Sequence, residues 1–332
     1  MNRPVVVKLG SSLVVDDDVV AGRAAEIGEL VRGGTPVCVV SSGAVALGLR
    51  RMNVERRPRS LPRLQAASAL GQPLLQRRWE DALSAHGVRA AQVLLTAAEI
   101  ADRRAYVNAR NTLHELHRLG VVPVVNENDA TATDEISFGD NDSLAAQVAV
   151  LVRARLLVLL TSVEGVLDTQ ASVIPTGTAA RSAVFGPGSP AGKGGMKSKV
   201  AAAELAAAAG IPTVIASGAE RLPAVLAGGG TRFAAAATGE SAFKLWLRFG
   251  KRVTGRVYVD AGAERAVRRK GGSLLAVGVV RCEGPVRVGD GVELCGVDGT
   301  PFGRGISSLD AAELAARPSN VEAVHRDRLI LY

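Results

Sequence analysis

Short side chains with carboxylate, amide and hydroxyl groups are concentrated in one stretch of the chain, residues 126–142, which reads NENDATATDEISFGDND. Carbonyl acceptors, amide donors and carboxylates together suit the binding of a small, charged molecule that carries an amine. The same residue types are common in turns, so a solvated loop is the alternative interpretation. The other polar segments of the chain are needed to decide between the two.

Two further segments, 8–12 and 193–199, combine lysine with glycine and serine and could hold a phosphate. In the first, KLGSS, the glycine lets backbone amides approach a ligand, the hydroxyls can donate, and the ammonium adds positive charge. The second, KGGMKSK, opens a predicted alanine-rich helix, where lysines are disfavoured unless a bound anion offsets them. The alternatives are a structural turn for the first segment and an exposed helix end for the second.

A fourth polar segment, Ser41-Ser42-Gly43-Ala44, lies where a predicted strand gives way to a predicted helix. Free backbone amides and the helix dipole at such a junction favour a carboxylate or a phosphate. A serine that only caps the helix is the alternative interpretation.

The elements that must position these segments follow from aliphatic runs and helical periodicity. Strands are predicted at 5–9, 36–40, 90–95, 121–125, 156–160 and 212–215. Helices are predicted at 17–32, 64–86, 99–119, from 143 onward and at 200–209. This alternation predicts a mostly parallel sheet covered by helices on both faces. The polar segments would then follow the carboxyl ends of strands, where open α/β sheets bind their ligands.

The pattern of predicted elements changes in the last quarter of the chain, from alternating strands and helices to short strands. Short predicted strands at 255–259, 274–281 and 291–295 are separated by Gly, Asp and Pro turns. We therefore predict two domains, residues 1–241 and 242–332, with the second one small and mainly β. The segment 168–192, rich in Pro, Gly, Ser and Thr, is predicted to be the least structured part of the first domain.

Charge and composition exclude several classes of protein. The net charge of the 332 residues is +8, and residues 244–332 hold 15 Lys and Arg against 10 Asp and Glu, so a basic tail could touch nucleic acid. The three cysteines have no zinc spacing and are predicted to be buried, reduced thiols.

No G-x-S-x-G, G-x-G-x-x-G or Walker A motif is present, and the four histidines are scattered. No apolar segment is long enough to span a bilayer, so we expect a cytoplasmic protein without membrane contact.

Several segments together resemble the glutamate 5-kinase family. Its members have the amino-acid-kinase fold, a three-layer αβα sandwich. The matching segments are 8–12, 41–44, 124–129, 139–142, 160–161 and 194–196 with Lys199. The tail is similar to the PUA domain that many members carry, through residues 255–260, 271–275 and 322–327.

The resemblance implies an activity and a set of site residues. The activity is ATP-dependent phosphorylation of the γ-carboxylate of L-glutamate to L-glutamyl 5-phosphate, the first step of proline biosynthesis, with Mg²⁺ carried on the nucleotide and no metal held by the protein. The implied catalytic residues are Lys8, Lys199 and Asp142, and the implied glutamate ligands are Ser42, Asp129, Asn141 and Asn126. The residues implied for ATP binding are Lys8, Gly10, Ser11, Thr161, Ser162, Lys193, Gly194, Gly195, Met196, Lys197, Ser198 and Lys199.

The chain departs from the family pattern on the nucleotide side. The family usually has Thr-Asp where this chain has Thr161-Ser162, a Thr or Ser in place of Lys193, and a longer segment between 167 and 192. A kinase for another small carboxylate, or an RNA-binding protein that acts through the basic tail, are the alternative functions. The resemblance also implies a homo-oligomer and a downstream glutamyl-phosphate reductase as partner.

Overall fold

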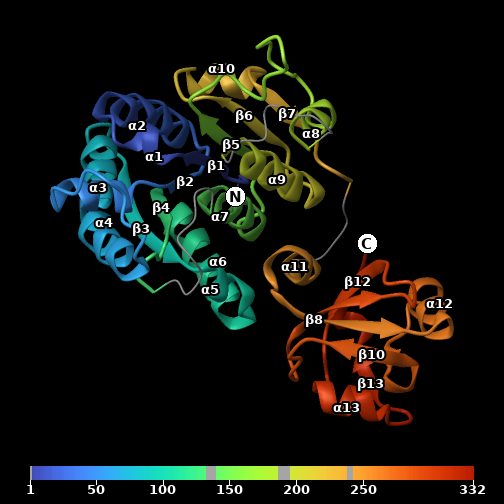
Figure 1. Cartoon of the computed structure of the whole chain (residues 1–332). Helices are drawn as coiled ribbons and strands as arrows, with labels where there is room; N and C mark the ends of the chain where they lie inside the picture. The colour runs from blue at the N-terminus through green and yellow to red at the C-terminus, as the bar shows by residue number, and fades with distance from the viewer. Residues whose placement is uncertain (1, 132–139, 186–194, 238–241) are drawn as a thin grey trace. The chain divides into compact units, whose positions relative to one another are not determined.

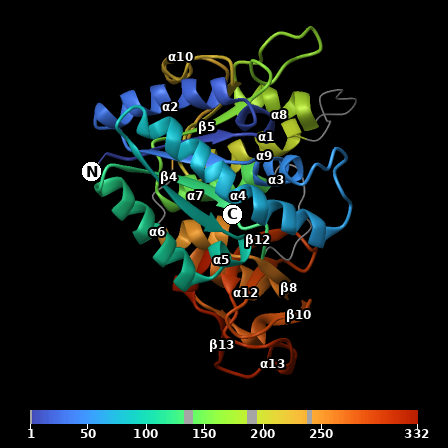
Figure 2. The same cartoon turned by 90° about the vertical axis from the view of Figure 1, so that its left-hand side faces the viewer.

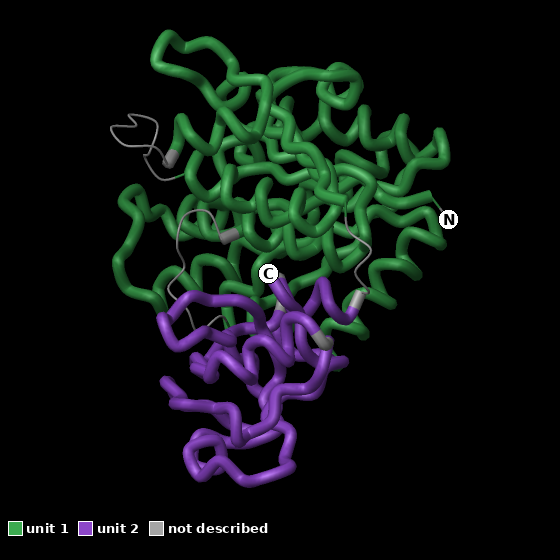
Figure 3. The backbone as a smooth tube through the Cα atoms, turned by 90° about the vertical axis from the view of Figure 1, so that its right-hand side faces the viewer, with its two compact units in different colours: residues 1–100, 104–238 green, residues 101–103, 239–332 purple. Residues whose placement is uncertain are grey.

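The computed structural model describes residues 2–131, 140–185, 195–237 and 242–332 (Figures 1 and 2). The chain forms two compact units, residues 1–100 with 104–238 and residues 101–103 with 239–332 (Figure 3). The larger unit contains a seven-stranded sheet and the smaller one a five-stranded sheet.

The seven-stranded sheet has the strand order β3-β4-β2-β1-β5-β6-β7. Its strands are β1 (Val5–Leu9), β2 (Val37–Ser41), β3 (Arg89–Leu95), β4 (Val121–Glu127), β5 (Leu156–Thr161), β6 (Thr213–Ser217) and β7 (Thr231–Phe233). Strands β1 to β6 run parallel, and β7 pairs antiparallel with β6 at the edge. Every residue of β1 and β2 is buried, which explains why their sequences are continuous aliphatic runs rather than alternating ones.

Ten helices are described in this unit, in the part of the chain outside 132–139 and 186–194. They are α1 (Ser11–Val14), α2 (Asp17–Arg32), α3 (Ala44–Arg51), α4 (Leu61–Ser84), α5 (Ala97–Ala101), α6 (Arg103–Arg118), α7 (Asp140–Leu151), α8 (Gly177–Phe185), α9 (Gly195–Ala208) and α10 (Leu222–Ala227).

The helices cover both faces of the sheet. Alternate residues of β1, among them Val7 and Leu9, share one hydrophobic cluster with α2, α4 and α10. Lys8 points to the opposite face, because successive side chains of a strand alternate, and there it contacts α7. Helices, sheet and helices therefore form three layers, and the predicted α/β sandwich is confirmed.

Three expectations about the elements of this unit were wrong, and one strand was not predicted. The predicted helix 99–119 is two helices, α5 and α6, and Asp102, a residue type that favours helix N-caps, separates them. The segment predicted to be least structured contains α8, which buries Ala180 and Val184. The edge strand β7 was not predicted, and it has only 3 residues. Helix α7 begins at Asp140 rather than at 143, so Asn141 and Asp142 stand in its first turn and not in a loop.

The smaller unit is mainly β. Its five-stranded sheet has the order β10-β8-β11-β12-β14, and β13 pairs with β9 in a second sheet. The strands are β8 (Val253–Val259), β9 (Leu274–Leu275), β10 (Val279–Glu283), β11 (Gly291–Cys295), β12 (Pro301–Ile306), β13 (Glu322–Val324) and β14 (Leu329–Leu331). The described helices are α11 (Ala242–Leu245), which continues as a π-helix over Trp246–Gly250, α12 (Ala261–Lys270) and α13 (Ala311–Ala316).

One strand predicted for this unit was wrong. The expected strand 274–281 is broken by a 3₁₀ turn at Ala276–Gly278, which separates β9 from β10. The break serves the core of the unit, because both Leu274 and Val279 are buried in it while Val277 between them is exposed. The strands β12, β13 and β14 were not predicted.

All three cysteines are free. Cys38 and Cys295 are buried, while Cys282 is half-buried. Burial raises the pKa of the Cys38 thiol to about 12. Among the described residues, no helix is both long and apolar enough to cross a membrane.

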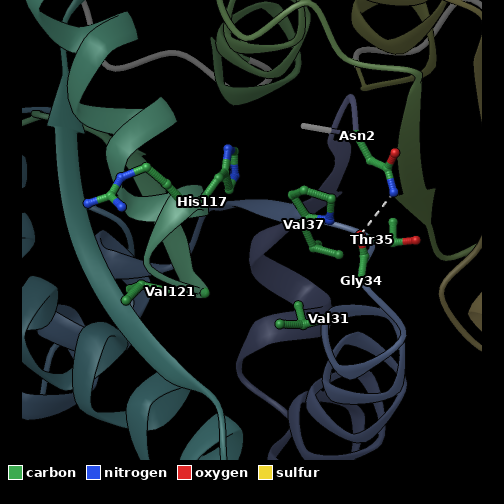
Figure 4. A pocket seen from close by; sticks show the side chains of 10 residues that line it. Asn2, Val31, Gly34, Thr35, Val37, His117 and Val121 are labelled. Carbon is green, nitrogen blue, oxygen red and sulfur yellow. Dashed lines mark hydrogen bonds between the residues drawn. The ribbon is translucent and has the colours of Figure 1, made fainter.

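A cavity of about 300 Å³ lies at the amino-terminal ends of β2 and β4 (Figure 4). Its lining includes Thr35, Val37, His117 and Val121. The side chain of His117, which comes from α6, is only 8% exposed. Burial is the main cause that lowers the pKa of His117 to about 4.

This buried histidine should make the fold sensitive to acid. Below the usual pKa near 6.5 the unfolded chain binds a proton at His117, but the folded chain does so only near pH 4. The free energy of unfolding should therefore be fully present above about pH 6.5 and fall by about 3 kcal/mol as the pH drops to 4. Urea denaturation across this range measures the slope. In His117→Leu the slope from this group should disappear, and an unchanged slope would contradict the assignment.

Candidate functional site

A buried carboxylate with two ammonium groups forms the centre of the site. Asp142, in the first turn of α7, is completely buried. Its Oδ1 lies 2.5 Å from Nζ of Lys8, and its Oδ2 lies 3.1 Å from Nζ of Lys199. Lys8 comes from the penultimate position of β1 and Lys199 from the start of α9. Three segments that are distant in sequence are thus joined by one side chain.

The electrostatics of this ion triad favour an anion. Lys8 is only 4% exposed, and burial lowers the pKa of its ammonium, as does the charge of Lys199. Asp142 opposes both effects through its charge and its hydrogen bond to Lys8. One carboxylate between two cations leaves a net positive charge at the carboxyl end of the sheet. Such a charge in a water-poor site suits a phosphoryl group.

Amide and hydroxyl groups lie next to the triad. Nδ2 of Asn141, the residue before Asp142, donates to Oγ of Ser42 at 2.8 Å and to Oδ1 of Asn126 at 2.9 Å. Asn126 is buried near the end of β4, and Ser42 follows β2. Gly43 follows with a φ of 117°, a left-handed conformation that favours glycine and turns the chain directly into α3.

Asp129, the remaining implied glutamate ligand, follows β4 and is half-buried. Its Oδ2 accepts a hydrogen bond of 2.9 Å from Oγ of Ser68 on α4. The structure therefore brings Ser42, Asn126 and Asn141 into mutual contact and ties Asp129 to a neighbouring helix.

The residues implied for nucleotide binding lie on three segments. Gly10 precedes α1, and a Cβ atom on it would stand 3.9 Å from Nζ of Lys8. Thr161 ends β5, and Ser162 follows it. Since Lys8 pairs with Leu159 in the register of β1 and β5, both lie just beyond Lys8 along the sheet. The remaining described residues of this set are in the first turns of α9 or at the start of α1, namely Gly195, Met196, Lys197, Ser198, Lys199 and Ser11.

Two implied residues, Lys193 and Gly194, lie outside the described residues, as does 132–139 of the acidic segment. Lys197 is exposed. Lysines at the start of a helix were expected to require a nearby anion. For Lys199 the carboxylate of Asp142 provides this negative charge.

Three polar residues that the sequence analysis missed support the site. Gln72 and Ser68, one turn apart on α4, contact Asn126 and Asp129. Trp79 of the same helix donates its indole N–H to Oγ of Ser41 at 2.9 Å. The sequence carried a signal for these residues. Ser68, Gln72 and Trp79 recur at helical spacing, so they share a face of α4, and polar side chains on a largely apolar face indicate a buried polar contact.

The described residues do not fit a metal site held by the protein. Among them, no group of three or more His, Cys, Asp and Glu side chains is placed to bind an ion. Asp142, the buried carboxylate of the site, is already paired with both lysines.

Comparison with known proteins agrees with this fold. Residues 3–217 match the amino acid kinase family, and residues 255–323 match the PUA domain. In structure the chain is similar to carbamate kinase from Giardia lamblia, at 17% identity with a TM-score of 0.52, over 71% of this chain and 99% of that one. It is also similar to N-acetylglutamate synthase from Neisseria gonorrhoeae, at 18% identity with a TM-score of 0.55, over 92% of this chain and 73% of that one. The fold and the site thus define an amino acid kinase.

Full-length relatives narrow the assignment. Glutamate 5-kinase of Methylobacillus flagellatus is 42% identical, over 98% of this chain and 97% of the relative. Glutamate 5-kinase of Burkholderia thailandensis is 41% identical, over 99% of this chain and 98% of the relative. The chain belongs to the glutamate 5-kinase family, and the resemblance inferred from its motifs is confirmed.

Proposed function

We propose that the protein transfers the γ-phosphoryl group of ATP to the γ-carboxylate of L-glutamate and releases ADP and L-glutamyl 5-phosphate. One observation carries the proposal: the ion triad of Lys8, Asp142 and Lys199 adjoins the amide cluster around Asn141, and neighbouring residues of α7 belong to the two groups. A positive centre for the moving phosphoryl group thus stands beside polar groups for a small amino acid.

Phosphoryl transfer to a carboxylate needs little covalent assistance, because the acceptor is already ionised. It needs in-line alignment and positive charge around a metaphosphate-like centre. Lys8 and Lys199 supply that charge from separate elements. Asp142 orients both lysines and opposes the lowering of the pKa of Lys8 by burial. These lysines are the proposed catalytic residues, with Asp142 as the group that organises them.

For the glutamate side we propose Ser42, Asn126, Asn141 and Asp129 as ligands. The hydroxyl of Ser42 can bind the α-carboxylate, and the carboxylate of Asp129 together with the carbonyl oxygen of Asn141 can bind the α-ammonium. Desolvated polar groups that pair only with the correct substrate reject analogues strongly, because the wrong ligand leaves them unpaired.

For ATP we propose the segments around Gly10, Thr161 and the start of α9, where backbone amides and Lys199 face the phosphates. We propose that Mg²⁺ is carried on the nucleotide, as membership of the kinase family implies. The assembly of several copies, the transfer of the unstable acyl phosphate to a reductase, the cytoplasmic location and the domain boundary at 241/242 remain predictions.

The test is ADP release by the purified protein with ATP, Mg²⁺ and a panel of L-glutamate, L-aspartate, N-acetylglutamate or no acceptor. We expect release that depends on L-glutamate. Lys8→Ala should lower kcat about 100-fold, because it removes charge from the transition state. Asp129→Ala should instead raise the KM for glutamate about tenfold, through the lost ionic contact. Release with another carboxylate would identify a kinase of different specificity.

The RNA-binding alternative has less support. Of the aromatic residues in the tail, Trp246, Tyr258 and Phe302 are buried, and only Tyr332 is exposed among those whose side chains are described. Arg281 and Arg256, which could contact phosphates, are paired with Glu283 and Glu293. An affinity for RNA that falls steeply with salt would restore this alternative if the kinase assay failed.

A further inference from the structure

A chain of amide hydrogen bonds runs from the outer strand of the sheet to the amide cluster. Nε2 of Gln72 on α4 donates to Oε1 of Gln92 on β3 at 3.3 Å. Oε1 of Gln72 accepts from Nδ2 of Asn126 at 2.8 Å. Asn126 then accepts from Asn141, which also donates to Ser42. This series of hydrogen bonds therefore links the amide groups of Gln92, Gln72, Asn126 and Asn141.

The direction of these hydrogen bonds, from donor to acceptor, decides which atom Asn141 offers to a ligand. Because Asn141 donates through Nδ2 to both Ser42 and Asn126, its carbonyl oxygen Oδ1 makes neither of these hydrogen bonds. This atom is buried and has no hydrogen-bond partner among the described residues. A buried acceptor without a donor is costly, so Oδ1 of Asn141 is suited to a donor that arrives with the ligand.

We propose that Gln72 is a positioning residue that makes the site selective for a substrate with an α-ammonium group. It is 8% exposed and contacts Asn126, one of the proposed glutamate ligands. By accepting from Asn126, it turns Oδ1 of Asn126 toward Asn141, and Asn141 in turn presents its own oxygen to the ammonium. This inference rests on the proposed function and adds a residue to it.

The alternative direction shows what Gln72 prevents. If Asn126 turned its amide round, its Nδ2 would donate to Asn141, and Asn141 would present an N–H₂ group to the ligand. That arrangement repels an ammonium and pairs with a carboxylate or a carbonyl. In Gln72 the hydrogen bond from Nε2 to Gln92 leaves Oε1 to accept from Asn126, and this enforces the observed direction. An apolar side chain at position 72 leaves both directions open.

The experiment compares L-glutamate with glutarate, which has both carboxylates but no ammonium. For wild type, Gln72→Met and Gln72→Glu, it measures kcat, the KM for glutamate and the inhibition constant of glutarate against glutamate. Met has a similar volume but makes no such hydrogen bond, and Glu keeps the acceptor. We expect Gln72→Met to raise the KM for glutamate about tenfold, with the glutarate constant changed less than about twofold.

The Glu variant should keep the KM within about threefold of wild type. An unchanged KM in Gln72→Met, an equal rise of KM and the glutarate constant, or an equal loss in both variants would overturn the proposal. Urea denaturation checks that both variants are folded. If wild type itself fails to phosphorylate glutamate, the proposed function fails first, and this is visible before any variant is compared.

Discussion

Replacing Asp142 with Asn should lower kcat by about 1000-fold. The substitution leaves the ammonium groups of Lys8 and Lys199 buried next to each other with no carboxylate between them. Burial and the charge of Lys199 already lower the pKa of Lys8, and Asp142 is the group that opposes them. Without it Lys8 loses its proton more readily, and the positive charge that stabilises the transferring phosphoryl group is reduced.

The pH dependence of kcat distinguishes the loss of the proton on Lys8 from a general distortion of the site. In Asp142→Asn the residual activity should increase as the pH is lowered, because Lys8 regains its proton. Removing one partner from buried ion pairs should also cost about 3 to 5 kcal/mol of unfolding free energy. Steady-state ADP release across a pH series and urea denaturation measure the two effects.

A matched control is Glu115→Gln, which breaks an exposed ion pair with Arg118. It should change neither kcat nor stability measurably, since exposed pairs contribute little. An Asp142→Asn protein with wild-type kcat would exclude the proposed role of the triad.

The second large effect is expected at the crossing of α3 and α4, where two glycines bring the helices into backbone contact. A Cβ atom on Gly71 would lie 1.8 Å from the carbonyl oxygen of Ala44 and 2.6 Å from the amide nitrogen of Gly48. A Cβ on Gly48 would lie 1.7 Å from the carbonyl oxygen of Ala67. Backbone atoms cannot yield as a side chain can, so any substitution must push the helices apart.

Gly71→Ala should therefore lower the unfolding free energy by about 3 kcal/mol, at the upper end of the range for overpacking. It should also raise the KM for glutamate, because α3 begins immediately after Ser42 and Gly43. Urea denaturation and ADP release measure the two consequences.

The matched control for this variant is Gly22→Ala in the exposed face of α2, where a Cβ meets nothing within 4 Å. Alanine there should stabilise the helix by about 0.5 to 1 kcal/mol. If Gly71→Ala behaved like Gly22→Ala, the close helix crossing would be disproved.

The sequence predicted best those elements whose signals are local. The bounds of β1 and α2 were predicted correctly, because β1 is an aliphatic run and α2 ends at Gly33. Asp16 caps α2 by accepting from the backbone N–H groups of Asp18 and Val19, a signal of the same local kind. By contrast β7, β9 and β13 have three residues or fewer and depend on pairing with distant partners. No local pattern specifies such strands.

The same distinction holds for the site. The family resemblance implied Lys8, Asn126, Asp142 and Lys199 as site residues, and each of them lies in a polar segment next to a strand or helix end. Gln72 was missed because its contact with Asn126 joins residues 54 positions apart. The helical spacing of Ser68, Gln72 and Trp79 indicates that they share one face of α4, but tertiary packing decides that this face turns Gln72 toward Asn126 of β4.

Helix α4 carries Ser68, Gly71 and Gln72 within little more than one turn, followed by Trp79 on the same side. Ser68 and Gln72 make hydrogen bonds to Asp129 and Asn126, and Gly71 sets the distance between α4 and α3. An insertion or deletion of one residue inside this helix would rotate everything beyond it by about 100°, since an α-helix has 3.6 residues per turn. We therefore expect the exposed segment 52–60 that precedes the helix to tolerate length changes, and α4 itself to tolerate substitutions only.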